Sequence, residues 1–277
     1  SKFSPRETWD TAALLALAYP DRIAKARGAA GQFLLANGRA GAIDAGHPLA
    51  RSPYIVVAEM QGRAAATRIL LSAACDEADV QRMAGSRIVS ADEVTFDEAA
   101  KAVRARRVRR LGAITLGSEQ RAVTAADDVA AVLADGVRRM GVGALPWTRA
   151  QQQVRQRVAF LRATDDTWPD LSDAALSTDT AAWLQSYLAG KTRIAEIDAD
   201  TLEQALSSIL PWSLRQRLEA EAPTHFESPT GNRHPLDYEG AGAPALHIRV
   251  QELFGLKQHP AIARGQDELP AYLRRFT

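Results

Sequence analysis

The spacing of apolar residues changes between helical and strand-like three times along the chain, which predicts four segments. In residues 8–27, Trp9, Ala13, Ala16 and Leu17 recur at helical spacing, and the run ends at Arg27-Gly28. This pattern predicts a helix. From residue 29 the apolar runs become short, partly β-branched and separated by turn sequences, as is typical of strands. Strands are expected at residues 32–36, 54–59, 68–73, 86–90, 94–96, 103–108 and 111–116.

These predicted strands surround one short helical segment at residues 76–83. A succession of short strands with a single small helix is typical of a compact barrel of the oligonucleotide-binding (OB) kind. An unrelated small β-sandwich would produce the same pattern, so both architectures stay open at this point.

Helical spacing returns at Thr124 and continues to residue 222. Helices are expected at residues 129–140, after a Thr148 cap, over 177–188, after a capping box at 200–203, and from Pro211 to Leu218. After Pro223 the pattern is again strand-like. Residues 225–228 and 235–238 flank the turn sequence Pro229-Thr230-Gly231-Asn232, which predicts a hairpin. A third strand is expected at 245–250, followed by a helical turn at 251–256.

The fold class expected from these periods is α+β: an OB-like β-barrel, a helical subdomain and a small β-rich C-terminal domain. The predicted domains are residues 1–28, the end of a helical domain; 29–123, the barrel; 124–222, the helical subdomain; and 223–277, the C-terminal domain. The boundaries are changes of period, and no flexible linker separates the segments.

Composition narrows the class of protein. The chain has 277 residues, with 34 Lys and Arg against 33 Asp and Glu, so any attraction to an acidic partner must come from local clustering. No run reaches the roughly 18–20 apolar residues of a membrane span. The single cysteine, Cys75, excludes an internal disulfide and fits a reducing compartment. The start, Ser1-Lys2, has no signal peptide pattern. We therefore expect a soluble cytoplasmic segment of a longer protein.

Motifs for catalysis and cofactors are missing from the sequence. There is no phosphate-binding loop of the G-x-x-x-x-G-K-[ST] type, no G-x-G-x-x-G after a strand, and no H-x-x-x-H pair. His225 and His234 are expected to face each other across the hairpin, but two ligands without a third do not make a metal site. Cys75 is expected to be a buried structural thiol. We predict no catalytic, cofactor-binding or metal-binding residue in this segment.

The distribution of charge is more informative. Residues 101–110 contain six cations and no anion, whereas residues 165–203 contain nine Asp and Glu against Lys191 and Arg193. A row of cations on one strand fits a phosphate backbone, which predicts contact with nucleic acid. Alternatively, these cations pair with Asp92, Glu93, Asp97 and Glu98 just upstream. The predicted nucleic-acid-binding residues are Lys101, Arg104, Arg106, Arg107, Arg109 and Arg110.

Strand alternation divides this basic row into two faces, and Arg104, Arg106 and Arg110 share the face that we expect to meet the nucleic acid. A weaker basic stripe, Arg149, Arg155, Arg157 and Arg162, is a candidate extension of the groove. A hypothesis of a different class also remains open. In it the chain is a protein-interaction scaffold without nucleic-acid contact, and its separated charges serve docking between domains.

Several blocks of the sequence resemble the HrpB family, bacterial DEAH-box ATP-dependent helicases. They are residues 12–24, 32–39 and 48–50, Arg109-Arg110-Leu111-Gly112-Ala113, Ser228-Pro229-Thr230-Gly231-Asn232, Asp237-Tyr238 and Gln251-Glu252-Leu253-Phe254-Gly255. The resemblance covers about residues 8–265, and these blocks are similar to the region that follows the helicase core in this family. The tail after Gly265 departs from the family pattern.

The resemblance implies an accessory region of an RNA-stimulated ATPase, in which residues 1–28 end a ratchet-like helical domain. In related helicases such a domain and an OB-fold close over single-stranded RNA. The expected partners are therefore single-stranded RNA and the motor domains of the same chain. ATP and magnesium are expected only in the motor, whose motifs this segment lacks. Gln251–Gly255 is expected to be structural, with Leu253 and Phe254 anchoring the terminal domain.

Overall fold

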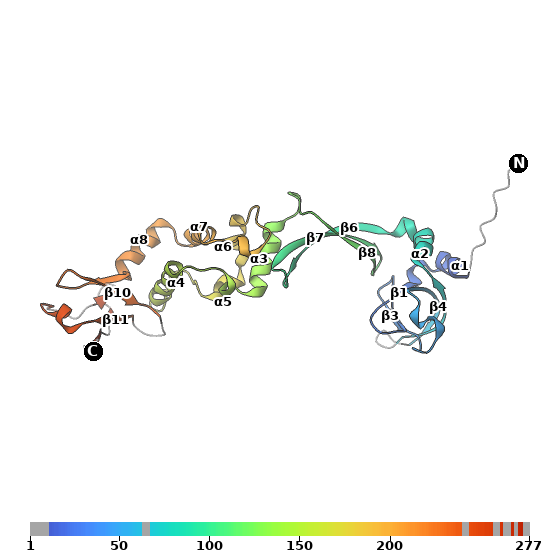
Figure 1. The fold of residues 1–277 in the computed structure, drawn as a ribbon, viewed down its shortest axis with the longest axis horizontal. Coiled ribbons are helices and arrows are strands. Elements are labelled where there is room, and N and C mark those ends of the chain that lie inside the picture. Colours follow the sequence, from blue (N-terminus) through green and yellow to red (C-terminus); the bar gives the residue numbers. More distant parts are fainter. Residues whose placement is uncertain are drawn as a thin grey trace. The chain divides into compact units, whose positions relative to one another are not determined.

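The computed structural model describes residues 11–62, 67–239, 244–256, 261–262, 267–268 and 271–273. The described chain forms two compact units. One runs up to Glu93 and includes Ala105–Val123, and the other comprises Val94–Arg104 and the residues from Thr124 onward. Helices and strands are mixed, with a closed five-stranded barrel and several small sheets, so the predicted α+β class is confirmed. Figure 1 shows the elements in chain order.

The first unit contains the barrel. Its strands pair in the closed order β1-β2-β3-β5-β4. The elements of this part are the helices α1 (Thr11–Ala18) and α2 (Glu77–Ala84), and the strands β1 (Ile23–Ala26), β2 (Gln32–Leu35), β3 (Ala40–Ala42), β4 (Tyr54–Gln61) and β5 (Arg68–Cys75). Phe33, Leu35 and Ile55 are fully buried in one apolar cluster of the barrel strands.

Two apolar faces of β4 explain why four successive residues, Tyr54 to Val57, are buried. Ile55 and Val57 belong to the cluster with Phe33. Tyr54 and Val56 belong to a second cluster that includes α1 and α2. The two helices contact each other, and α1 contacts β4 and β5 (Figure 1). Cys75 is buried in the second cluster, as expected for a structural thiol.

The helix predicted over residues 8–27 is wrong in its second half. The chain leaves α1 at Ala18, passes through a 3₁₀ turn at Pro20–Arg22, and enters the barrel as β1 at Ile23. Pro20 cannot continue an α-helix, because it lacks an N–H and its ring clashes with the preceding turn. Trp9, which contributed to the predicted helical stripe, lies outside the described residues.

The strands after α2 do not belong to the barrel, contrary to the prediction that it extends to residue 123. They form a separate three-stranded sheet in the order β6-β7-β8, with β6 at Val89–Asp97, β7 at Ala102–Leu111 and β8 at Ile114–Arg121. The physical reason is closure. Ile23 of β1 pairs with Val56 of β4, so the five barrel strands leave no edge for another strand.

The second unit has one apolar core, to which helices and strands both contribute. The helices are α3 (Val129–Met140), α4 (Arg149–Arg162), α5 (Asp173–Thr178), α6 (Thr180–Leu184), α7 (Ala199–Ile209) and α8 (Trp212–Glu221). The strands are β9 (His225–Glu227), β10 (Arg233–Asp237), β11 (Ala245–Ile248), β12 (Ala261–Ile262), β13 (Asp267–Glu268) and β14 (Ala271–Leu273). Leu236 and Ile248 from the strands share the core with Trp168 and Leu184.

Three local predictions in this unit need correction. Residues 177–188 are not one helix: α5 and α6 are separated at Asp179, whose side chain accepts from Ala182 N and starts a new helix. The cap of α7 is Asp198, whose carboxylate accepts from Thr201 N at 2.8 Å, and not the box at 200–203. In the confirmed β9–β10 hairpin, His225 lies opposite Pro235, so the two histidines do not face each other.

Phe254 is the clearest error of the sequence reasoning. Only Val250–Leu253 forms a helical turn, of the 3₁₀ type. Leu253 packs against the core, whereas Phe254 is 68% exposed and anchors nothing within the described residues. Two adjacent apolar residues point in different directions at the end of a 3₁₀ turn, so only one of them can be buried.

Candidate nucleic-acid interface

The basic residues of the sequence lie on β7, and local structure explains its course. Val103 and Ala105 are buried and share one side of the strand, and Val108 is buried on the other. A bulge between Arg109 and Arg110 shifts the pairing with β8 before the turn at Gly112. That turn requires glycine, because its φ is +55° and a Cβ would lie 2.1 Å from the carbonyl oxygen of Ala36.

Arg106 and Arg110 share one face of β7 and one partner. Arg106 Nη2 lies 3.1 Å from a Glu93 carboxylate oxygen, and Arg110 Nη2 lies 2.5 Å from the other oxygen of the same group. In the second unit, Arg104 Nε lies 4.0 Å from Asp97, at the limit of an ion pair. The predicted alternation thus holds for Arg106 and Arg110, which contact the same carboxylate.

The opposite face carries the other two arginines. Arg107 Nε lies 2.9 Å from Asp92, and Arg109 Nη2 lies 3.0 Å from Glu77 on α2. The hydrogen bond from Arg107 lowers the pKa of the Asp92 carboxyl. Lys101 lies in the β6–β7 turn with a positive φ of 50° and is exposed.

These pairs match the alternative interpretation of the basic row to a large extent. Three of the four expected acids, Asp92, Glu93 and Asp97, contact β7 arginines, whereas Glu98 pairs with Arg139 of α3. The arginine side chains nevertheless stay 43–60% exposed. Ion pairs at such exposed positions contribute little to stability and are screened by salt. The geometry therefore allows exchange of a carboxylate for a phosphate.

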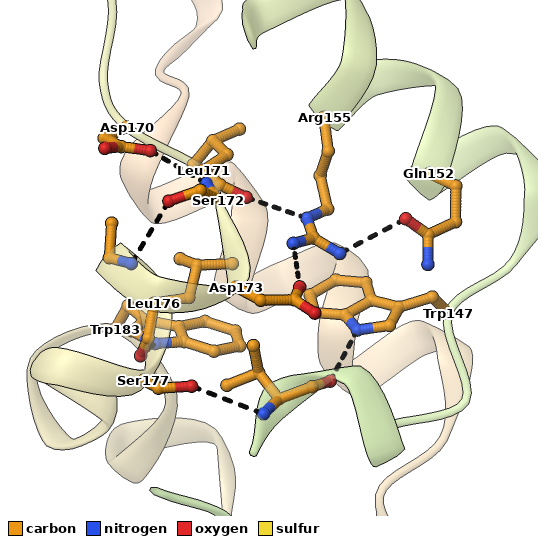
Figure 2. Close-up of polar contacts among 12 residues, drawn as sticks. Trp147, Gln152, Arg155, Asp170, Leu171, Ser172, Asp173, Leu176, Ser177 and Trp183 are labelled. Atoms are coloured by element: carbon orange, nitrogen blue, oxygen red, sulfur yellow. Dashed lines mark hydrogen bonds and ion pairs between the residues drawn. The ribbon is translucent and has the colours of Figure 1, made fainter. Parts of the chain in front are cut away.

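The second basic stripe does not exist as a surface feature. Figure 2 shows Arg155 surrounded by its partners. Its Nε donates to the carbonyl oxygen of Leu171 at 2.9 Å, its Nη2 contacts Asp173, and its guanidinium stacks over Trp147 at 4.7 Å. The Trp147 ring in turn stacks on Trp183. Arg155 holds three segments of the second unit together.

Arg157 is buried still more completely, with 2% of its side chain exposed. It donates to the carbonyl oxygens of Ala222 and Leu218 at the end of α8, at 2.5 and 3.2 Å. Arg162 donates to the carbonyl oxygen of Trp168. Of the four residues of the predicted stripe, three are thus engaged with backbone carbonyls, and the prediction of an extended basic groove on α4 is wrong.

Sequence reasoning did not find the role of Glu252. Its carboxylate accepts hydrogen bonds from Ser228 Oγ at 3.2 Å, from Thr230 Oγ1, and from Asn232 Nδ2 at 2.9 Å. These donors lower the pKa of Glu252 to about 2. The two sequence blocks 228–232 and 251–255 therefore meet in one hydrogen-bonded cluster. The presence of both blocks in the sequence was the signal that could have indicated this contact.

In the part of the chain that the structure describes, no group of three His, Cys, Asp or Glu side chains is placed to hold a metal ion. None of the helices described is long and apolar enough to cross a membrane.

Comparison with known proteins defines the class. A family model described as ATP-dependent helicase C-terminal matches residues 183–273. This part of the chain is thus similar to the C-terminal region of ATP-dependent helicases. The particular similarity is to HrpB: a model of the connector region of ATP-dependent RNA helicase HrpB matches residues 87–120, which contain the β6–β7–β8 sheet except Arg121.

One curated relative, the ATP-dependent RNA helicase HrpB of Escherichia coli strain K12, is 32% identical over 259 residues, which are 92% of this chain and 32% of the relative. Two crystal structures of E. coli HrpB match with TM-scores of 0.54 and 0.53, at 32% and 30% identity. Each match covers 95% of this chain and 33% of the crystallised one. The chain thus spans about a third of its relatives' length, and the resemblance to the family that the sequence blocks indicated is confirmed.

Proposed function

We propose that this chain is the accessory region of an ATP-dependent RNA helicase and holds single-stranded RNA through phosphate contacts along β7. The observation that supports this most directly is the set of exposed arginine side chains on β7, whose carboxylate partners are themselves accessible to solvent. The number of barrel strands and their closure fit an OB-like barrel, a fold that binds oligonucleotides.

The physical basis is an exchange of partners. A phosphate that approaches Arg106 and Arg110 competes with one carboxylate, that of Glu93. Binding of the phosphate backbone also releases condensed counterions, an entropy gain that an internal ion pair lacks. The contacts are to phosphate, so they position the strand without reading its sequence.

The alternative function is a protein-interaction scaffold without nucleic-acid contact. The observation in its favour is that all five arginines of β7 have a carboxylate oxygen within 4.0 Å. Of the six predicted binding residues, this leaves Lys101, which precedes the strand. Under this alternative the pairs hold the β6–β7–β8 sheet together and offset much of its positive charge.

The deciding experiment measures the affinity of the 277-residue chain for a labelled single-stranded RNA by fluorescence anisotropy at several salt concentrations. Contacts of Arg104, Arg106 and Arg110 predict a slope of log affinity against log salt of about −2, at roughly −0.7 per phosphate. Arg106→Gln with Arg110→Gln should reduce the slope to about −0.7. The matched control, Arg107→Gln with Arg109→Gln, removes two arginines from the opposite face and should leave the slope unchanged.

The direction in which a single substitution changes RNA affinity distinguishes the two functions. Glu93→Gln removes the carboxylate that competes for Arg106 and Arg110, so it should strengthen RNA binding if these residues hold phosphate. Under the scaffold function the same variant loses sheet stability and gains no affinity. A wild-type chain that does not bind single-stranded RNA at low salt would leave only the scaffold function.

The remaining parts of the proposal follow from the relatives. The expected partner besides RNA is the motor part of the same helicase, because the relatives are about three times longer than the matched region. We place the protein in the cytoplasm, which fits its single buried free cysteine.

A further inference from the structure

A cleft of about 780 Å³ in the second unit has no role in the function proposed above. It lies between the first half of α4 and the strands β9, β10 and β11. The polar side chains that matter for its chemistry are Arg149, Gln153, Gln156, His225 and His247. Its volume is in the range of pockets that bind small organic ligands, about 300–1,000 Å³.

The side chains on the two walls differ in kind. From α4 come Gln153 and Gln156, whose amide groups have no hydrogen-bond partner among the residues described. An amide both donates and accepts, so it pairs with flat heterocycles that present a donor beside an acceptor. From the strands come two imidazole rings, those of His225 on β9 and His247 on β11, which share the sheet face of Pro235; His234 of β10 lies on the opposite face, with its Nε2 3.6 Å from Glu252. Imidazole rings are among the side chains on which bases stack.

The charged side chains of the cleft narrow the chemical class of its ligand. Asp237 and Glu239 line it together with Arg149, so it is not a site for an isolated phosphate. Carboxylates accept hydrogen bonds from the exocyclic amino groups of bases. Adenine and cytosine carry such an amino group beside a ring acceptor, whereas uracil has no amino group. Arg149, exposed at the first turn of α4, supplies a cation for the phosphate attached to the base.

We propose that this cleft binds an adenine or cytosine base of single-stranded RNA, with Gln153 and Gln156 on the base edge and the histidines against its face. The assignment of this base to an RNA strand rests on the proposed function. The cleft would then supply the base preference that phosphate contacts along β7 lack.

The first test uses mononucleotides, so it does not depend on β7. Histidine imidazole signals of the full chain are followed by NMR while AMP, CMP or UMP is added at millimolar concentration. AMP and CMP should shift His225 and His247 and leave His47 of the first unit unchanged, and UMP should have a much smaller effect. The absence of shifts with AMP and CMP, or equal shifts with UMP, overturns the proposal and leaves the β7 proposal untouched.

The second test identifies the source of the base. The full chain should bind a labelled oligo(A) about tenfold more tightly than an oligo(U) of equal length. Gln153→Ala with Gln156→Ala should remove this preference and leave oligo(U) binding unchanged. The matched control is Gln204→Ala with Gln216→Ala, which truncates two exposed glutamines of α7 and α8 outside the cleft.

The outcomes separate the two proposals. A reduced salt slope in the variant Arg106→Gln with Arg110→Gln, together with intact AMP shifts, supports both. AMP shifts without any preference for oligo(A) would mean that the cleft takes a free nucleotide, which overturns the assignment to RNA. A preference for oligo(A) that survives the Gln153 and Gln156 substitutions overturns the role of these residues.

Discussion

Glu252 connects the 3₁₀ turn at Val250–Leu253 to the β9–β10 turn through a single carboxylate. Ser228, Thr230 and Asn232 all donate to it, and His234 Nε2 lies 3.6 Å away. In the turn between β9 and β10, Gly231 has a φ of +82°. Because three donors converge on one acceptor, the protonation state of Glu252 controls the whole cluster.

We expect this cluster to make stability depend on pH in the acid range. The pKa of Glu252 is lowered to about 2 in the folded protein, from 4.5 ordinarily, by hydrogen bonds from Thr230, Asn232 and Ser228. The stabilisation is therefore present above pH 4.5 and is lost as pH falls from there through about 2. The melting temperature measured against pH should drop less steeply over this window in Glu252→Gln than in wild type.

The control for that measurement is Glu227→Gln, which changes an exposed carboxylate of the same hairpin without a hydrogen bond to the cluster. Its pH profile should follow wild type. A Glu252→Gln profile that parallels wild type between pH 4.5 and 2 would contradict the assigned role.

Residues 252–254 also show the limit of sequence reasoning at this scale. Leu253 and Phe254 are both apolar and adjacent, and apolarity alone predicts burial for both. The 3₁₀ turn ends at Leu253, so Leu253 packs on the core and Phe254 remains exposed. The direction in which a side chain points at the end of a turn depends on backbone angles, which composition does not encode.

At the scale of elements, Arg157 links α4 to the end of α8. The last carbonyls of a helix have no partner within it and need a donor from elsewhere. The carbonyl oxygen of Leu218 accepts from the Ala222 N–H, whereas that of Ala222, a fully buried residue, is served by the Arg157 guanidinium, which also donates to Leu218. Its Nη2 also lies 2.9 Å from Glu219. This arrangement explains a cation inside the core of the second unit.

Removal of this donor should destabilise the protein strongly. Arg157→Met keeps much of the aliphatic volume but leaves the buried carbonyl oxygen of Ala222 unpaired, which should lower the free energy of unfolding by about 2 kcal/mol. Arg157→Lys should lie between Met and wild type, because one ammonium group replaces a fork of donors. Urea unfolding followed by circular dichroism measures both variants.

Arg138→Ala is the control for that series, since Arg138 of α3 pairs with Asp135 on the surface and is 49% exposed. It should change stability little. If Arg157→Met unfolds at the same urea concentration as Arg138→Ala, the guanidinium does not hold α8.

For the whole molecule, the sequence predicts that this segment lacks the machinery to hydrolyse ATP. The chain spans about a third of the length of the E. coli ATP-dependent RNA helicase HrpB to which it is similar, and no phosphate-binding loop occurs in its sequence. Purified chain should therefore show no ATP turnover above a buffer blank, with or without RNA. Phosphate release measured by a coupled assay, with full-length E. coli HrpB as positive control, tests this expectation.

Turnover that rises with RNA, disappears with EDTA and follows the chain through purification would contradict it. A trace activity that separates from the chain during chromatography belongs to a contaminant. The assay is informative in combination with RNA binding, because the proposed function requires binding without hydrolysis.

The sequence by itself determined the α+β class, the change of period at Thr124, the β9–β10 hairpin and the family resemblance. These features depend on local periodicity, turn residues and short motifs, which lie in contiguous stretches of chain. Only the tertiary structure decided that the barrel closes after β5, that Arg155 and Arg157 are buried, and that the β7 arginines meet carboxylates of β6 and α2. Closure and burial depend on contacts between residues far apart in the chain, and a basic residue looks the same in sequence whether its partner is a phosphate, a carboxylate or a carbonyl.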